Sequence, residues 1–289
     1  MNVDLAKKGS GTVEFRDGCL LKFANSSILK VQATAIVLPA NKSMRHARTC
    51  ARAIRDNLGK TEDLKEYWLQ NECDLRLDDE DRSQYEMGET MIVEVRSAPH
   101  RKLPQTFHHV ICVAGPDLKK IDRKKGKHAE RAWQVGLDAV QDTVRSTLES
   151  AEQAGFSSIC IPMICCGNYR SRTQEELEVY YRILKTVWEW FEFSKSKPIL
   201  DEITLVTYAP RVHEHLQMNL AFEQLCQEKS VPLPGPKQQE VGTLDFQIIN
   251  QEKPIENKSK QTTPAKAHQV SQGFLSKDGP PESKVPFNK

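Results

Sequence analysis

Short runs of apolar and β-branched residues recur along the chain up to about residue 208, and each run is short enough to be a strand. The runs lie at residues 12–15, 20–23, 35–38, 91–95, 109–113, 158–162 and 202–208. Several are almost wholly apolar, which is typical of strands that are buried on both faces of a sheet. The pattern therefore predicts a sheet whose central strands are covered on both sides.

Longer stretches between these runs carry apolar residues three or four positions apart, which is the spacing of one helix face. The first such helix is predicted at residues 129–154, and its apolar positions are Trp133, Leu137, Val140, Val144 and Leu148. A second helix is predicted to begin at the capping-box pattern of residues 173–176, and a last one spans 212–227. Helices between strands imply crossover connections, so we expect an α/β fold with a central mixed, mostly parallel sheet.

Composition divides the 289 residues into one folded domain and two flanks. From residue 229 onward Pro, Lys, Gln, Glu and Ser dominate, and such a stretch cannot bury enough apolar surface to offset its ordering entropy. We predict a domain at 12–228, a disordered N-terminus at 1–11 and a disordered tail at 229–289. The apolar residues 244–249 are either a docking peptide for a protein partner or a few apolar residues in a flexible segment.

Two charged inserts interrupt the domain, an acidic one at about 61–86 and a basic one at about 118–131. The basic insert is suited to nucleic-acid phosphates or to a nuclear import signal. It also fits a solvated loop, which is favoured because no aromatic residues interleave with the cations to stack on bases. Nucleic acid is thus a weakly supported partner.

The remaining composition points to the cytoplasm, the nucleus or both. The formal net charge of +2 favours neither membranes nor nucleic acid, and no run approaches the ~20 apolar residues that span a bilayer, so no membrane partner is expected. The N-terminus lacks the apolar core of a secretory signal. None of the eight cysteines forms a CxxC pair, so we expect no metal site and no cofactor. Scattered free thiols suit a reducing compartment.

Function is expected in the loops that follow the carboxyl ends of the predicted strands, where open α/β sheets bind ligands. The first loop reads Pro-Ala-Asn-Lys-Ser-Met at 39–44, and the second reads Met-Ile-Cys-Cys-Gly-Asn-Tyr at 163–169. Between them lie Gly-Glu-Thr-Met-Ile at 88–92 and Val-Ile-Cys-Val-Ala-Gly-Pro at 110–116. Taken in order, over roughly residues 20–226, these segments resemble the motifs of the macrodomain family. The resemblance implies a three-layer α/β/α macrodomain-like fold.

The resemblance also implies a ligand, ADP-ribose or an ADP-ribosylated protein, held by backbone N–H groups of the two loops. Ser27, followed by Ile28, takes the place of the family's adenine-binding aspartate. Asn41 matches an asparagine that contacts the ribose, although a turn residue that ends a strand is the alternative. Tyr208 matches an aromatic that packs on adenine, and a residue at the edge of the core is its alternative.

Several glycines of the family pattern are replaced by side chains. The glycine run of the first loop falls on residues 46–49, where side chains oppose a close approach of the backbone to a phosphate. The guanidinium groups of Arg45 and Arg48 are instead well shaped to bind the phosphate directly. In the second loop Gly167 is kept, and Arg170 replaces the last glycine. The predicted ligand contacts are therefore Ser27, Ile28, Asn41, Arg45, Arg48, Cys166, Gly167, Asn168, Tyr169, Arg170 and Tyr208.

The position that matches the family's catalytic aspartate is Ala51, and alanine can neither accept a proton nor orient a water. We therefore expect binding without hydrolysis. Two alternatives stay open. One is a domain that has lost the ligand and is a scaffold for protein interactions. The other is an ADP-ribosyl hydrolase or phosphatase whose catalytic group has moved to His46 or Cys166.

Overall fold

The computed structural model describes most of the chain up to residue 231. The described residues are 2–6, 10–15, 17–45, 50–63, 65–95, 98, 106–123, 127–166, 170–171, 176–194, 197–207 and 212–231. The chain divides into two units, Met1–Gln239 and Glu240–Lys289, and every described residue belongs to the first. Apart from residues 229–231, the predicted tail lies outside the described residues and its disorder stays a prediction.

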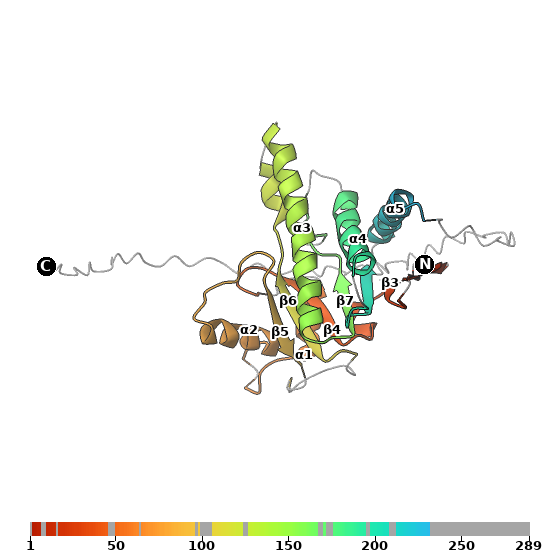
Figure 1. Ribbon diagram of the computed structural model, residues 1–289. Coiled ribbons are helices and arrows are strands. Elements are labelled where there is room, and N and C mark those ends of the chain that lie inside the picture. Colours follow the sequence, from red (N-terminus) through yellow and green to blue (C-terminus); the bar gives the residue numbers. More distant parts are fainter. Residues whose placement is uncertain are drawn as a thin grey trace, which may run out of the picture. The chain divides into compact units, whose positions relative to one another are not determined.

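One mixed sheet of eight strands forms the centre of the described part, in the order β1-β2-β3-β8-β7-β4-β6-β5 (Figure 1). The strands are β1 (Asn2–Ala6), β2 (Ser10–Glu14), β3 (Leu20–Asn25), β4 (Ala35–Ala40), β5 (Thr90–Glu94), β6 (His109–Ala114), β7 (Ser158–Pro162) and β8 (Glu202–Thr207). Strands β3, β8, β7, β4 and β6 run parallel, while β1, β2 and β5 pair antiparallel with their neighbours. The predicted mixed, mostly parallel sheet is confirmed.

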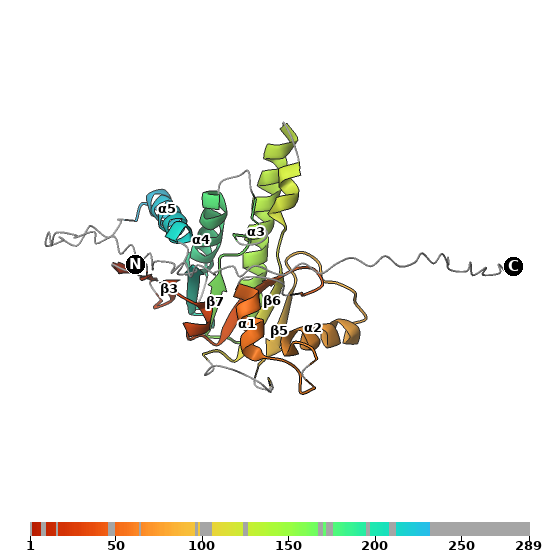
Figure 2. The same ribbon diagram turned by 180° about the vertical axis from the view of Figure 1, so that it is seen from behind.

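Helices cover both faces of this sheet. Helices α1 (Cys50–Leu58) and α2 (Trp68–Asp79) lie on one face, and α3 (Lys127–Gln153), α4 (Glu176–Glu192) and α5 (Val212–Glu228) lie on the other, as the two opposite views show (Figures 1 and 2). Of two 3-10 helices, η1 (Ile28–Lys30) connects β3 to β4 and η2 (Leu118–Arg123) connects β6 to α3. The predicted three-layer α/β/α architecture is therefore confirmed.

The sheet has a separate apolar core on each face, which explains why its central strands are wholly apolar. In β4, Ile36 packs into the core beneath α1 and α2, while Val37 packs into the core beneath α3, α4 and α5, and neither side chain is exposed. Cys112 and Cys160 are also fully buried and belong to the α1–α2 side. A strand that faces two cores has no polar side, so the usual alternation of polar and apolar residues disappears.

The structure corrects the prediction of a disordered N-terminus at 1–11. Strand β1 pairs with β2 from Asn2 opposite Glu14 to Ala6 opposite Ser10, and β2 in turn pairs with β3. Backbone hydrogen bonds to a neighbouring strand hold this edge of the sheet. Composition does not reveal such bonds, because every residue type except proline can make them.

Both charged inserts contain ordered structure. The acidic insert at 61–86 holds α2, whose Leu69, Cys73 and Leu77 are spaced four apart and buried. The basic insert begins with η2, and its first residue, Leu118, is fully buried. The described part of the basic insert is therefore anchored to the domain, and residues 124–126 lie outside the described residues.

Candidate functional site

The carboxyl ends of the five parallel strands form one edge of the sheet, in the order β3, β8, β7, β4 and β6. Three pairs of strand-end residues are in register there: Asn25 with Thr207, Pro162 with Val206, and Ala40 with Ala114. Segments from distant parts of the sequence therefore leave the sheet side by side. This carboxyl edge is where open α/β sheets bind ligands, and it is the candidate functional site.

The predicted contacts that the structure describes all follow strands that end at the carboxyl edge. Ser27 and Ile28 follow β3, Asn41 and Arg45 follow β4, and Cys166 and Arg170 follow β7. The other predicted contacts, Arg48, Gly167, Asn168, Tyr169 and Tyr208, lie outside the described residues, as does His46.

Ser27 and Ile28 lie at the β3 end of the edge and differ in exposure. Ser27 is half-buried, and its side chain does not cap η1. Ile28 is 5% exposed and packs into the core, so only its backbone can meet a ligand. Nearby, the side-chain oxygen of Asn25 is buried and has no hydrogen-bond partner among the described residues. The sequence analysis missed Asn25, because nothing in its local pattern distinguishes it from an ordinary strand-end residue.

Asn41 organises the loop after β4. Its Oδ1 accepts a hydrogen bond from the N–H of Arg45 at 2.8 Å, and its carbonyl accepts one from the N–H of Met44 at 2.8 Å. Met44 is fully buried and has a φ of +50°, a conformation that few residues other than glycine adopt. The oxygen of Asn41 therefore has the turn role that the sequence left open, and its side-chain amide N–H groups make neither of these bonds.

The loop after β7 is held by a second residue with left-handed backbone. Cys165 has a φ of +64°, and its thiol donates a hydrogen bond to the carbonyl of Pro116 at 3.2 Å. This bond ties the loop after β7 to the loop after β6. Left-handed conformations of ordinary residues cost of order 1–3 kcal/mol and persist only where packing enforces them, often at functional sites. Met44 and Cys165 thus give both candidate loops a defined shape.

Cys166 is a packing residue of the loop. Its thiol is 2% exposed and donates to the carbonyl of Ile164 at 3.5 Å, and its N–H donates to the carbonyl of Met163 at 3.4 Å. Burial raises the pKa of the Cys166 thiol well above its ordinary value, and burial also raises the pKa of Cys165. A buried neutral thiol is a poor nucleophile. The buried thiol therefore speaks against Cys166 as a nucleophile, and the predicted ligand contact at Cys166 stays a prediction.

Arg170 is exposed at the carboxyl edge but is not free. Its Nη1 donates to Oε1 of Glu176, the first residue of α4, at 3.0 Å, and the Nε2 of His213 lies 3.6 Å from the other oxygen of Glu176. The Arg170 side chain is 53% exposed and the Glu176 side chain is 14% exposed. Glu176 therefore holds a solvent-facing guanidinium in place. Sequence analysis assigned Glu176 only to a capping box, because its pairing with Arg170 depends on the path of the loop.

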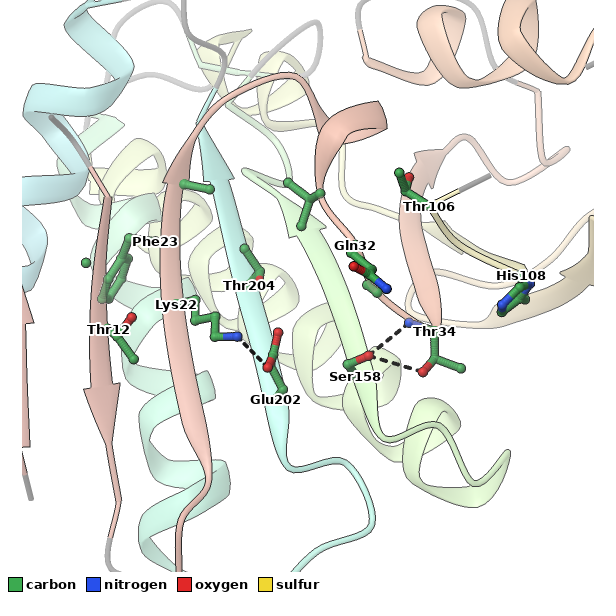
Figure 3. Close-up of a pocket in the computed structure, with 14 residues that line it drawn as sticks. Thr12, Lys22, Phe23, Gln32, Thr34, Thr106, His108, Ser158, Glu202 and Thr204 are labelled. Atoms are coloured by element: carbon green, nitrogen blue, oxygen red, sulfur yellow. Dashed lines mark hydrogen bonds and ion pairs between the residues drawn. The ribbon is translucent and has the colours of Figure 1, made fainter. Parts of the chain in front are cut away.

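Of the hollows formed by the described residues, two border the parallel strands of the sheet. The larger, of about 1230 Å³, opens at the carboxyl edge beside Asn41, between the ends of β4 and β6 and the start of α3. The smaller, of about 760 Å³, lies over β3, β8 and β7 (Figure 3). Its polar side chains bond to one another: Lys22 to Glu202 at 2.5 Å, and the hydroxyl of Ser158 to the backbone N–H of Thr34 at 2.9 Å. These bonds pair four of the residues that line the smaller hollow with one another.

The described part of the chain offers neither a metal site nor a membrane-spanning helix. No group of three or more acidic, histidine or cysteine side chains there is arranged to hold a metal ion. No helix in that part has both the length and the apolar character needed to cross a membrane.

The comparisons with known proteins agree with this geometry. Residues 37–180 match the family described as Macro domain. A macrodomain from Oceanobacillus iheyensis with ADP has a TM-score of 0.60 and 16% identity, over 79% of this chain and 100% of that chain. A mutant of that macrodomain with ADPR has a TM-score of 0.59 and 17% identity, over 75% of this chain and 99% of that chain. A sequence comparison with curated proteins finds no match.

At such low identity the solved structures establish the fold, and the family match covers the strands and loops from β4 to the first turns of α4. Both findings coincide with the order of motifs along the chain and with the row of loops at the carboxyl edge. The chain is therefore a divergent member of the macrodomain family.

Proposed function

We propose that the domain binds ADP-ribose, free or attached to a protein, along the carboxyl edge of β3, β8, β7 and β4, and that it does not hydrolyse it. The observation that carries the proposal is the juxtaposition of the loops after β7 and β4, two neighbouring strands of the sheet. Solved structures of the same fold include macrodomains with ADP and with ADPR.

The order of the strands suggests how the nucleotide lies. Adenine is proposed at the β3–β8 end, near Ser27 and Tyr208. The oxygen of Asn25, which has no hydrogen-bond partner among the described residues, supports the assignment, because it is an acceptor suited to an exocyclic amine. The diphosphate is proposed over the two loops, and the distal ribose beside Asn41 at the end of β4.

Side-chain cations are proposed to replace the backbone contacts that the family's glycines allow. Arg45 is exposed at the end of the loop after β4, and Arg170 presents a guanidinium that Glu176 already orients. Guanidinium binds phosphate through charge-assisted, often bidentate hydrogen bonds. Such a site binds an anionic diphosphate without a glycine-rich loop.

The absence of hydrolysis is supported by the environment of Ala51. This residue is 6% exposed and its methyl group packs into the core beneath α1. Cys166 is a buried, neutral thiol. The other candidate for a relocated catalytic group, His46, lies outside the described residues.

Calorimetric titration with ADP-ribose tests binding, and incubation with an ADP-ribosylated protein tests turnover. We expect saturable one-to-one binding and no release of ADP-ribose. Turnover that is lost in His46→Ala would establish the hydrolase alternative. If ADP-ribose fails to bind even at millimolar concentration, the domain is a scaffold that has lost the ligand.

A further inference from the structure

The larger hollow is a groove at the β4–β6 end of the carboxyl edge. Asn41 and Pro116 line it where the strands end, and η2 and the first half of α3 form its far wall. Two large apolar side chains in it face solvent: Met87 is 51% exposed and Val135 is 61% exposed. The start of α3 extends beyond the strand ends on this side of the molecule (Figure 1). Exposed apolar side chains gathered in a groove are a feature of binding sites.

The far wall of the groove is fixed by close packing. Leu118 of η2 is fully buried, and a Cβ at Gly136 of α3 would lie only 2.3 Å from Cδ1 of Ile121. The missing side chain at Gly136 therefore lets η2 rest directly on α3. As a result, Lys120 of η2 and Arg131 of α3 are held on one rim of the groove.

Among the described residues, the charge on this rim is positive. Lys120 and Arg131 are exposed, and neither makes an ion pair with a residue that the structure describes. On the opposite side, Lys42 is neutralised by Glu86, whose carboxylate lies 2.6 Å away. Asp117 is the acid in the lining, and its carboxylate accepts the N–H of Lys119 at 3.2 Å. The rim therefore attracts an acidic ligand.

The lining distinguishes between classes of acidic ligand. No Phe, Tyr or Trp is among the described residues that line the groove, and the imidazole of His128 is the one aromatic ring there, so the lining offers little surface on which nucleic-acid bases can stack. The apolar surface of Met87 and Val135 instead suits an aliphatic or aromatic side chain. The combination matches a polypeptide segment with acidic residues and an apolar anchor.

We infer that this groove binds the polypeptide that carries the ADP-ribose, next to the site of attachment, and that it selects acidic segments with an apolar side chain. The inference rests on the proposed function, because Asn41 is both the proposed ribose contact and part of the groove lining. A chain attached to the distal ribose would leave the nucleotide site at Asn41 and enter the groove directly.

The test compares four probes by fluorescence anisotropy or calorimetry. The first probe is free ADP-ribose. The second is an acidic decapeptide that carries one serine-linked ADP-ribose flanked by Glu, Asp and Leu, and the third is the same modified peptide with Gln, Asn and Ser in place of these flanking residues. The fourth is the acidic peptide without ADP-ribose. We expect the modified acidic peptide to bind about tenfold more tightly than free ADP-ribose. The modified neutral peptide is expected to bind like free ADP-ribose.

Two groove variants, Val135→Asp and the double variant Lys120→Glu/Arg131→Glu, are expected to remove this tenfold advantage and to leave the affinity for free ADP-ribose unchanged. Matched controls elsewhere on the surface are Leu216→Asp on α5, at a position that is 52% exposed, and Arg145→Glu at an exposed position of α3. Both controls should keep the advantage.

Each other outcome overturns a defined part of the argument. Equal affinity for the modified acidic peptide and free ADP-ribose overturns the groove, and so does an advantage that survives the groove variants. A polymer of ADP-ribose that gains the same advantage would show that the rim binds phosphate instead. If free ADP-ribose fails to bind while the unmodified acidic peptide binds through Val135, the proposed function fails and the groove is a peptide site. If no probe binds, both fail.

Discussion

In the proposed site the guanidinium of Arg170 binds both Glu176 and a phosphate of the ligand. A guanidinium carries five N–H donors, so the bond from Nη1 to Glu176 leaves donors available for a phosphate. Because Glu176 is only 14% exposed, it stays close to Arg170 and limits the conformations of the long side chain. A cation that is held in place before the ligand arrives loses less conformational entropy on binding.

The first prediction concerns this cation. Arg170→Glu is expected to weaken ADP-ribose binding at least tenfold, about 1.4 kcal/mol, because it replaces an attraction for phosphate by a repulsion. Wild-type affinity is expected to fall between low and physiological salt, since an exposed charge is screened. Calorimetry at the two salt concentrations measures both effects. Arg145→Glu is the control, and unchanged binding by Arg170→Glu would exclude this loop from the site.

The buried thiols provide a second prediction at the residue scale. Burial raises the pKa of Cys165 and Cys166, and it raises the pKa of Cys226 to about 11. The unfolded chain loses these protons near the ordinary thiol value of about 8.5, while the folded chain retains them. The unfolded state then binds fewer protons, so the free energy of unfolding should fall as the pH rises above about 9.

Urea unfolding at pH 7 and pH 10 measures this effect. A thiol reagent at pH 7 provides the control, because protonated buried thiols should be labelled slowly in the folded protein and rapidly after unfolding. Rapid labelling of Cys165 or Cys166 in the folded protein would show that the loop after β7 opens to solvent.

At the scale of elements, α2 shows how a charged insert becomes part of the fold. Its polar residues face solvent, while Trp68, Leu69 and Cys73 pack against β5 and β6 through the core on that side of the sheet. Tyr85 lies at the end of the insert and is 4% exposed, and its hydroxyl donates to the carboxylate of Glu80 at 2.9 Å. Burial and this hydrogen bond raise the pKa of Tyr85 to about 12.

The third prediction uses two leucines of α2 that differ in burial. Leu69 is fully buried and Leu75 is 51% exposed. Leu69→Ala is expected to lower the free energy of unfolding by about 2–5 kcal/mol, because it leaves a cavity in a packed core. Leu75→Ala should change it by less than about 0.5 kcal/mol. Chemical denaturation compares the two, and similar small losses for both would mean that α2 is not an integral part of the domain.

At the scale of the whole molecule, ordered contacts continue beyond α5. The Nζ of Lys229 pairs with a carboxylate oxygen of Glu192, the N–H of Val231 donates to the carbonyl of Cys226 at 2.9 Å, and Val231 packs against the core. These contacts extend the domain at least to residue 231, three residues beyond its predicted end at 228.

The fourth prediction is that residues 240–289 are dispensable for folding. Their removal is expected to leave the thermal midpoint unchanged within about one degree, since a composition poor in apolar residues makes few stabilising contacts. Truncation after Glu228 instead removes Lys229 and Val231 and should lower the midpoint by roughly 2–4 °C for each ~1 kcal/mol lost. Scanning calorimetry of the two truncated proteins separates the cases, and an equal drop in both would show that the tail docks on the domain.

The fold was largely predictable because its strands and helices have local signatures. Strands β4, β6 and β7 are buried on both faces, so their apolar residues follow one another without interruption. Helix α3 is buried on one face, so its apolar residues recur every three or four positions. The order of the loop motifs likewise determined the family. Sequence alone could identify these features because each one depends on residues that are close together along the chain.

Tertiary structure decided the features that depend on contacts between distant segments. Strand β1 exists through backbone pairing with β2, Cys166 is buried by the packing around it, and Arg170 is oriented by Glu176. The groove at Asn41 combines residues of the loop after β4 with residues of η2 and α3, and their proximity cannot be seen in any one of these segments. Burial, ion pairing and concavity are properties of how segments meet, so they appear only when the chain has folded.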